Sequence, residues 1–279
     1  PRCRISPRAA GVGYQGVASF WPRALAPEVS PPSAGRGRPL PRCRRLPVMT
    51  RSAGAVPPAV SPARLRAVGR RLAAAHGEPP APRRLPPLDE LVLTILSQHT
   101  SDVNRDRAFD DLRRALPTWS DVADAPVPAI ARAIRRGGLA PTKAVRIKAL
   151  LGELRAQGRS LDERAFRGMR APALYDLLVA LPGVGPKTAA CVLLFSLGKP
   201  YFPVDTHVHR IALRLGLVPP GTDAVKTQLA LQAAIAPADM YAVHMNLIRH
   251  GRTVCDAQQP KCEECVLATL CPMVGVVGR

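Results

Sequence analysis

A glycine hairpin followed by a lysine is the first part of this sequence that could do chemistry. It is written LPGVGPKTA over residues 181–189. Gly183 and Gly185 can adopt positive φ and let a second backbone approach closely. A helix that begins at Pro186 would present unpaired N–H groups and the positive end of its dipole, which together bind phosphate. An ordinary turn between two helices would use glycines in the same way.

Lys187 lies in the first turn of that helix. The helix dipole disfavours a positive charge there, and partial burial would act in the same direction. Both effects favour the free amine, which beside a DNA phosphate is a nucleophile for a sugar carbon. The plainer interpretation is a lysine that only contacts phosphate.

A carboxylate follows in PVDTHVHR, where Asp205 opens another predicted helix. Aspartate is among the best N-cap residues, and capping alone would explain it. A carboxylate at a helix N-terminus is also stabilised in its charged form, and it could stabilise a cationic sugar transition state. An amine and a carboxylate near a phosphate-binding hairpin form a set suited to breaking an N-glycosidic bond.

Four of the seven cysteines lie within 17 residues, spaced C-x6-C-x2-C-x5-C, and are Cys255, Cys262, Cys265 and Cys271. This clustering, in a chain without a recognisable secretory signal, favours metal binding over disulfides. Four thiolates within 17 residues can surround one metal centre, and zinc held by four thiolates is the runner-up. The charged residues between them make the segment too polar for a core. Cys191 lies in an apolar helix, and we expect it only to pack there.

The charge is spread over the whole chain. The net charge is +20 and the isoelectric point about 11.0, as in proteins that bind nucleic acid and in basic tails. Residues 1–60 hold ten Arg and one acid, hence +9, and the remaining residues carry the other +11. The same 60 residues hold eleven prolines and show no helical or strand period, so we expect a disordered extension. Translation from Met49, the first methionine, would remove most of it; a genuine basic tail is the alternative.

The rest of the chain, from Pro62 on, has a helical pattern throughout. Leu88, Leu91, Val92, Ile95 and Leu96 mark one helix face, and SPARLRAVGRRLAAAHG is an amphipathic helix with Ser61 as its cap. VPAIARAIRRGG and PKTAACVLLFSLG are each predicted to form one helix. No convincing alternating strand is present, and no apolar run reaches the roughly 20 residues that span a bilayer. The sequence therefore predicts an all-α protein of about ten helices.

Taken together, LPGVGPKTA, VDTHVHR and the cysteine spacing resemble endonuclease III, of the helix-hairpin-helix DNA glycosylase superfamily. The likeness runs from about residue 62 to residue 271. It implies two helical lobes with a cleft between them for DNA. One lobe would be a six-helix barrel containing the hairpin, over 89–199. The other, an iron–sulfur cluster domain, would combine 62–88 with 200–279.

The resemblance also implies an activity, base excision repair. Lys187 would be the Schiff-base lysine and Asp205 the catalytic carboxylate of a bifunctional DNA glycosylase and AP lyase acting on oxidised pyrimidines. The four clustered cysteines would hold a 4Fe–4S cluster. The partner would be double-stranded DNA with damaged bases or abasic sites, and we expect a monomeric, cytoplasmic, nucleoid-associated protein of bacterial type without a membrane partner.

The resemblance further implies residues that contact DNA, which are Gly183, Gly185 and Thr188 of the hairpin, Gln98 or His99, and Lys261. The text LSQHTSD departs from the family, in which a glutamine enters the gap left by the flipped base. Aligned on Asp102, that position holds His99, with Gln98 one residue earlier. A shift of one residue turns a side chain about 100° around a helix, so both cannot play the same part. Both could also merely end a helix in solvent.

Two other functions remain open at this point. A monofunctional uracil or thymine mismatch glycosylase would use Lys187 only as a phosphate ligand. A non-catalytic DNA-binding module would use the hairpin as a clamp, although the presence of both Lys187 and Asp205 disfavours that function.

Overall fold

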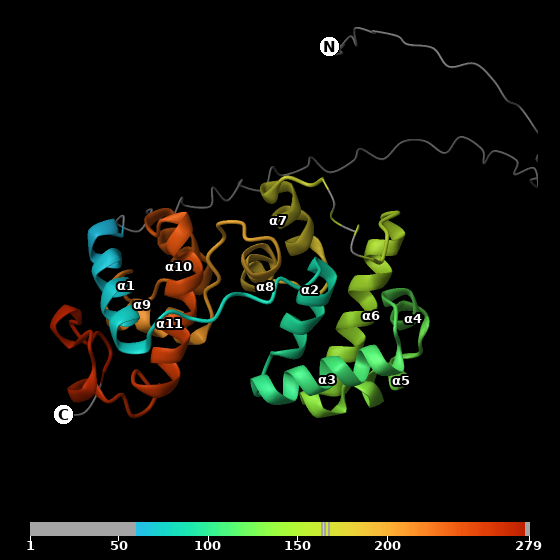
Figure 1. Cartoon of the computed structure of the whole chain (residues 1–279), viewed down its shortest axis with the longest axis horizontal. Helices are drawn as coiled ribbons and strands as arrows, with labels where there is room; N and C mark the ends of the chain where they lie inside the picture. The colour runs from blue at the N-terminus through green and yellow to red at the C-terminus, as the bar shows by residue number, and fades with distance from the viewer. Residues whose placement is uncertain (1–59, 163, 165, 167, 277–279) are drawn as a thin grey trace, which may run out of the picture. The chain divides into compact units, whose positions relative to one another are not determined.

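The computed structural model describes residues 60–276, apart from 163, 165 and 167, and every regular element in that part of the chain is helical (Figure 1). The predicted all-α class is therefore confirmed. The expected extension over 1–60 lies outside the described residues except for Val60, which is buried. None of the described helices is long and apolar enough to cross a membrane. The α-helices are α1 (Pro62–His76), α2 (Pro87–Leu96), α3 (Asp102–Ala115), α4 (Trp119–Asp124), α5 (Val127–Ala133), α6 (Ala140–Ala156), α7 (Ala171–Ala180), α8 (Pro186–Cys191), α9 (Thr206–Arg214), α10 (Ala224–Ala234) and α11 (Met240–Thr253).

Local sequence signals place most of these helices correctly. Ser61 and Ser101 cap α1 and α3, each accepting the N–H of the residue three positions later at 3.4 and 3.3 Å. The apolar face predicted for α2 is buried, with each of its five residues at most 1% exposed. The short α4 was not predicted, and a capping box between Thr118 and Asp121 begins it.

Two predicted helices change form along their length. The helix expected over VPAIARAIRRGG ends at Ala133, and its last turn tightens into a 3-10 helix over Arg135–Gly137, which is common at helix ends. The helix expected over PKTAACVLLFSLG stays α-helical only to Cys191 and widens into a π-helix over Val192–Ser196. Such turns occur often at functional sites.

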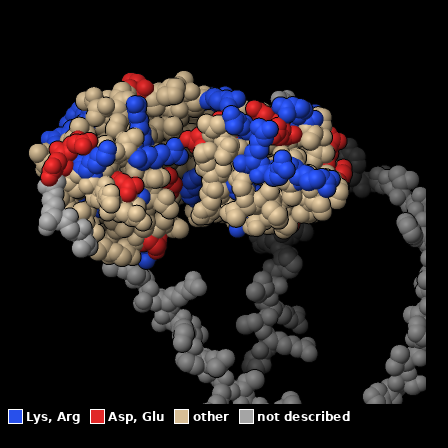
Figure 2. Space-filling model, turned by 90° about the horizontal axis from the view of Figure 1, so that it is seen from below, with Lys and Arg blue, Asp and Glu red and all other residues tan. Residues whose placement is uncertain are grey.

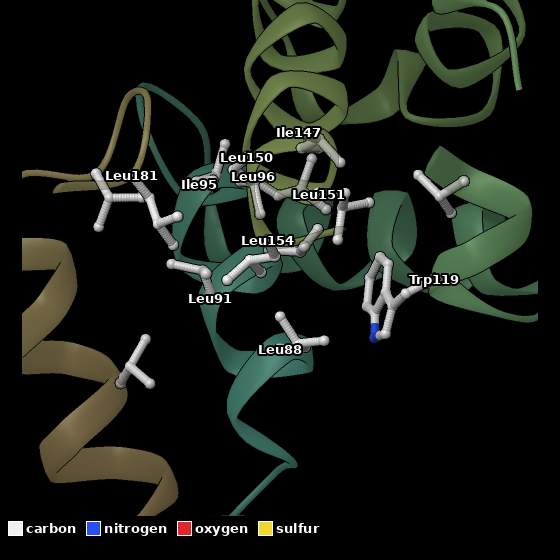
Figure 3. Packing of buried hydrophobic residues seen from close by; sticks show 14 of the residues in the cluster. Leu88, Leu91, Ile95, Leu96, Trp119, Ile147, Leu150, Leu151, Leu154 and Leu181 are labelled. Atoms are coloured by element: carbon white, nitrogen blue, oxygen red, sulfur yellow. The ribbon is translucent and has the colours of Figure 1, made fainter. Parts of the chain in front are cut away.

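The buried hydrophobic residues form two separate clusters. The first cluster contains residues from every α-helix from α2 through α8. Figure 3 shows leucine and isoleucine side chains of α2 and α6 that point toward one another beside Trp119. The second cluster joins α1 to α9, α10 and α11. The chain passes from the first to the second within the π-helix, between Leu193 and Leu194. Two clusters agree with the two helical lobes expected from the sequence, while the division at 199–200 stays a prediction.

A buried lysine ties the end of α2 to the start of α6. Lys143 is 1% exposed, and its Nζ donates to the carbonyls of Leu96 and Gly137, both at 2.7 Å. Burial lowers the pKa of Lys143. These two bonds satisfy carbonyls that helix ends leave without partners. They also fix the turn that carries Gln98 and His99.

Replacing this lysine tests how much the tie contributes. Lys143→Met leaves two carbonyls without donors, and we expect the free energy of unfolding to fall by about 2–5 kcal/mol. Lys148→Met is a matched control, because Lys148 also donates to two carbonyls, at 2.9 and 2.6 Å, from a half-buried position. The midpoint of urea unfolding should fall further in Lys143→Met than in Lys148→Met. An unchanged midpoint in that variant would exclude the tie as a stabilising feature.

Candidate active site

A cleft of about 930 Å³ is lined by residues from helices of both hydrophobic clusters. Its walls combine α2, α8, the start of α9, α11 and the segment between α1 and α2. Figure 2 shows Lys and Arg side chains spread in long runs over one face of the described residues, whereas Asp and Glu are scattered. A basic surface of this kind suits a polyanion. The side chains with acid–base or nucleophilic chemistry on the cleft walls include Glu90, His99, Lys187, Asp205 and His244, and Gln98 lies beside them.

The two hairpin glycines have different local reasons for being glycine. Gly183 has φ 75°, and a Cβ there would lie 3.3 Å from the side chain of Arg146. Gly185 has φ −97° and open space where a Cβ would project. The first glycine therefore permits the turn itself. The second leaves room for another backbone to approach, as a phosphate contact requires.

The helix after the hairpin begins at Pro186, as predicted, and places Lys187 half-buried on the cleft wall. The amides of its first turn have no helical carbonyl to bond. The side chain of Thr188 is 4% exposed and points into the protein. A contact of Thr188 with DNA would therefore go through its backbone N–H.

Asp205 lies on the same cleft and caps α9, since its Oδ1 accepts the N–H of Val208 at 2.8 Å. The charges of Lys187 and Asp205 both act on the buried imidazole of His244. Burial lowers the pKa of His244 to about 4; the charge of Lys187 acts in the same direction, and Asp205 opposes it. The structure thus brings together the two residues that the sequence singled out as nucleophile and carboxylate.

Glu90 is a cleft residue that sequence reasoning missed. It is 9% exposed, and Thr94 Oγ1 donates to its Oε1 at 3.2 Å. Burial raises the pKa of Glu90 to about 7, although the Thr94 hydrogen bond and the charges of Arg105, Lys187 and Arg83 lower it. A glutamate within the apolar run of α2 was the signal that could have revealed it.

Gln98 and His99 follow the end of α2 in a turn, so the argument that places them about 100° apart around a helix does not apply. Gln98 is half-buried, and its Oε1 accepts from Arg146 at 2.9 Å. His99 is exposed and has φ 52°, a strained conformation for a non-glycine residue. The plainer alternative, in which both side chains merely end a helix in solvent, leaves the Arg146 contact of Gln98 unexplained.

Leu139 is a second residue with a strained backbone, and no sequence pattern predicted it. It has φ 48° and is 57% exposed. A Cβ on its neighbour Gly138 would lie 3.7 Å from the carbonyl oxygen of His99. The turn that carries Leu139 therefore approaches the backbone of His99, and backbone strain of this kind often marks function.

The four clustered cysteines line one small pocket of about 30 Å³ beside Arg214 and Lys261. Arg214 donates to Cys255 Sγ at 3.3 Å, and the N–H of Met273 donates to Cys271 Sγ at 3.4 Å. Within 60–276, no set of three or more Cys, His, Asp or Glu is arranged to hold a single metal ion. Four cysteines that line one pocket, two of which accept N–H donors at sulfur, suit thiolate ligands of a larger centre. The exposed Lys261 lies here and is not part of the cleft.

Comparison with known proteins places the site in context. Residues 92–237 match the HhH-GPD superfamily of base excision DNA repair proteins. The chain is 37% identical to endonuclease III of Thermotoga maritima over 186 residues, which cover 66% of this chain and 82% of the relative. It is 40% identical to a putative DNA glycosylase of Arabidopsis thaliana, At3g47830, over 67% of this chain and 65% of the plant protein.

A solved non-covalent complex of endonuclease III with DNA matches the fold with a TM-score of 0.65 and 28% identity, over 76% of this chain and 96% of the other. These similarities confirm the resemblance that three sequence motifs indicated.

Proposed function

This chain belongs to the HhH-GPD superfamily of base excision DNA repair proteins, and we propose that it is a bifunctional DNA glycosylase and AP lyase for oxidised pyrimidines. One observation carries the proposal. Lys187, which follows a glycine hairpin with open space over Gly185, lines the same cleft as Asp205.

The first step is extrusion of the damaged base into the cleft. This costs a few kcal/mol, and it costs least for bases that are already poorly paired. The amides at the start of α8 hold the adjacent phosphate and set the position of the sugar. His99 is an exposed side chain on the cleft that can fill the vacated space, and the exposed Leu139 is a second candidate.

The chemical steps then use Lys187 and Asp205. The amine of Lys187 attacks the sugar C1′, and the bond between C1′ and the base nitrogen breaks. Asp205 stabilises the positive charge that develops on the sugar. The adduct opens to an imine between Lys187 and C1′. Loss of a proton from C2′ then expels the 3′ phosphate by β-elimination and cuts the strand.

The cysteine pocket completes the proposal, with Cys255, Cys262, Cys265 and Cys271 as the ligands of a 4Fe–4S cluster. Such a cluster would join the loop after α11 to the C-terminal end of the described chain. We assign it no part in the reaction steps.

Metal analysis tests this assignment. Purified protein should be yellow-brown and contain about four irons per chain, and Cys262→Ser should lose most of the iron and melt at lower temperature, because ligand binding and folding are coupled. Cys191→Ala is the control and should keep its colour, since Cys191 is buried and lies outside the cysteine pocket. Colourless protein with one zinc per chain after anaerobic purification would contradict the cluster.

A panel of oligonucleotide duplexes tests the function itself. Each duplex carries one oxidised pyrimidine, one uracil or thymine opposite guanine, or one abasic site, and products are scored with and without alkali. Strand cleavage without alkali indicates a lyase. Cleavage only after alkali would instead indicate a monofunctional glycosylase, and binding without any reaction would indicate a DNA-binding module.

A further inference from the structure

Glu90 is a buried carboxyl group that lacks a cationic partner. It is 9% exposed, and its one hydrogen bond comes from Thr94 on its own helix. In the described part of the chain, no lysine, arginine or histidine nitrogen lies within ion-pair distance of it. A buried carboxylate is costly unless a cation and hydrogen bonds compensate it, so this environment favours the neutral acid.

The charges around Glu90 come from three other parts of the structure. The segment before α2 contributes Arg83, α3 contributes Arg105, and α8 contributes Lys187. Arg105 is already engaged, since it forms ion pairs with Asp102 and Asp106 at 3.1 and 2.8 Å.

The remaining neighbours of α2 bring no charge to Glu90. The π-helix Val192–Ser196 has no ionisable side chain. From α6, Lys143 and Arg146 reach the opposite end of α2, at Leu96 and Gln98. Burial therefore outweighs the distant cations, and the pKa of Glu90 is raised to about 7.

Glu90 also belongs to the same group of side chains as the proposed nucleophile. It lines the cleft with Lys187 and Asp205. All three act on the thiol of Cys191, which lies among them: burial raises its pKa to about 11, Lys187 opposes the rise, and Glu90 and Asp205 add to it. A carboxyl group held largely neutral beside a nucleophile is the arrangement of a general acid.

Base release needs such an acid. When the bond to C1′ breaks, the electron pair stays on the base, and a proton must reach that base to stabilise it. The amine of Lys187 is forming a bond to C1′ at that moment. Asp205 has to stay ionised to stabilise the positive charge on the sugar, and one of its oxygens accepts the N–H of Val208.

We propose that Glu90, in its protonated form, donates the proton to the departing base. This rests on the glycosylase function proposed above. In the step, the bond between the Lys187 nitrogen and C1′ forms, the bond between C1′ and the base breaks, and the Glu90 proton moves to the base. The carboxylate that remains takes a proton from solvent before the next turnover.

Single-turnover rates of base release separate this role from the others. Glu90→Gln keeps the shape and removes the proton, and we expect base release from an oxidised pyrimidine duplex to slow on the order of 10²-fold. Cleavage of a pre-formed abasic site should stay within about twofold, because no base has to leave. Glu153→Gln replaces an exposed glutamate on α6 and should match the wild type in both assays.

The pH profile gives a readout that a structural role would not move. Wild-type base release should fall about tenfold per pH unit above pH 7, as Glu90 loses its proton. Thr94→Val should move this limb to higher pH, because the Thr94 hydrogen bond lowers the pKa of Glu90. In Glu90→Gln, the decline of base release above pH 7 should be absent.

Three results would overturn the proposal. Glu90→Gln could release base at the wild-type rate with the same pH profile. It could lose base release and abasic-site cleavage equally, which would assign Glu90 to the fold or to Lys187. Wild-type enzyme could release no base from any duplex of the panel, and that result alone would remove the proposed glycosylase function as well.

Discussion

We expect Lys187→Gln to abolish strand cleavage and borohydride trapping, while affinity for abasic-site DNA stays within about tenfold, or ~1.4 kcal/mol. The reason is the position of Lys187 in the first turn of α8, half-buried on the cleft wall. In the proposed reaction its amine forms the imine, whereas we expect binding to depend on several phosphate contacts, of which Lys187 would supply one. Lys187→Arg should be equally inactive, because a guanidinium stays protonated and does not form an imine.

Gel assays of cleavage and trapping, with affinity measured separately, check this result. Lys199→Gln is the control, because it removes an exposed lysine that follows the same helix without lining the cleft. If Lys187→Arg still gave a trapped adduct at the wild-type rate, the nucleophile would be another amine, and Lys187 would be a phosphate contact only.

Asp205→Asn should lower base removal by at least about 10²-fold and still cleave pre-formed abasic sites in part. In the proposed reaction the carboxylate stabilises the charged sugar while the base leaves, and that stage is absent from an abasic substrate. Asparagine caps a helix nearly as well as aspartate, so α9 should stay intact. The loss would then reflect charge and not folding.

The chain provides a matched control for this change. Asp223 caps α10 as Asp205 caps α9, accepting an N–H three residues later at 2.8 Å, but it is exposed and outside the cleft. Asp223→Asn should have the same melting temperature as Asp205→Asn and retain full base removal. Equal activities of the two variants on a lesion duplex would show that the charge of Asp205 is not needed.

The sequence predicted those features that depend on neighbouring residues. Ser61 and Ser101 are caps, Pro186 begins a helix, and Gly183 has the positive φ that its turn requires. The apolar spacing of α2 predicted its buried face for the same reason. In each case the local conformation is determined by residues a few positions apart in the chain.

The features that the sequence missed depend on tertiary packing. Glu90 falls in an apolar helix, and only the meeting of α2, α3 and α8 shows that it is buried without an ion pair beside Lys187. The roles of Gln98 and His99 were assigned on a helix that ends before them. The contact of Arg146 with Gln98, across 48 residues, decides which of the two is exposed.

Peptide mapping of the borohydride-trapped adduct tests the central claim most directly. Wild-type protein is trapped on a duplex with one abasic site, digested, and analysed by mass spectrometry for the peptide that retains the nucleotide. The added mass of the trapped nucleotide should be found on Lys187. An adduct on another amine, such as Lys199 or Lys261, or no adduct although strands are cleaved, would contradict the assignment of Lys187 as the nucleophile.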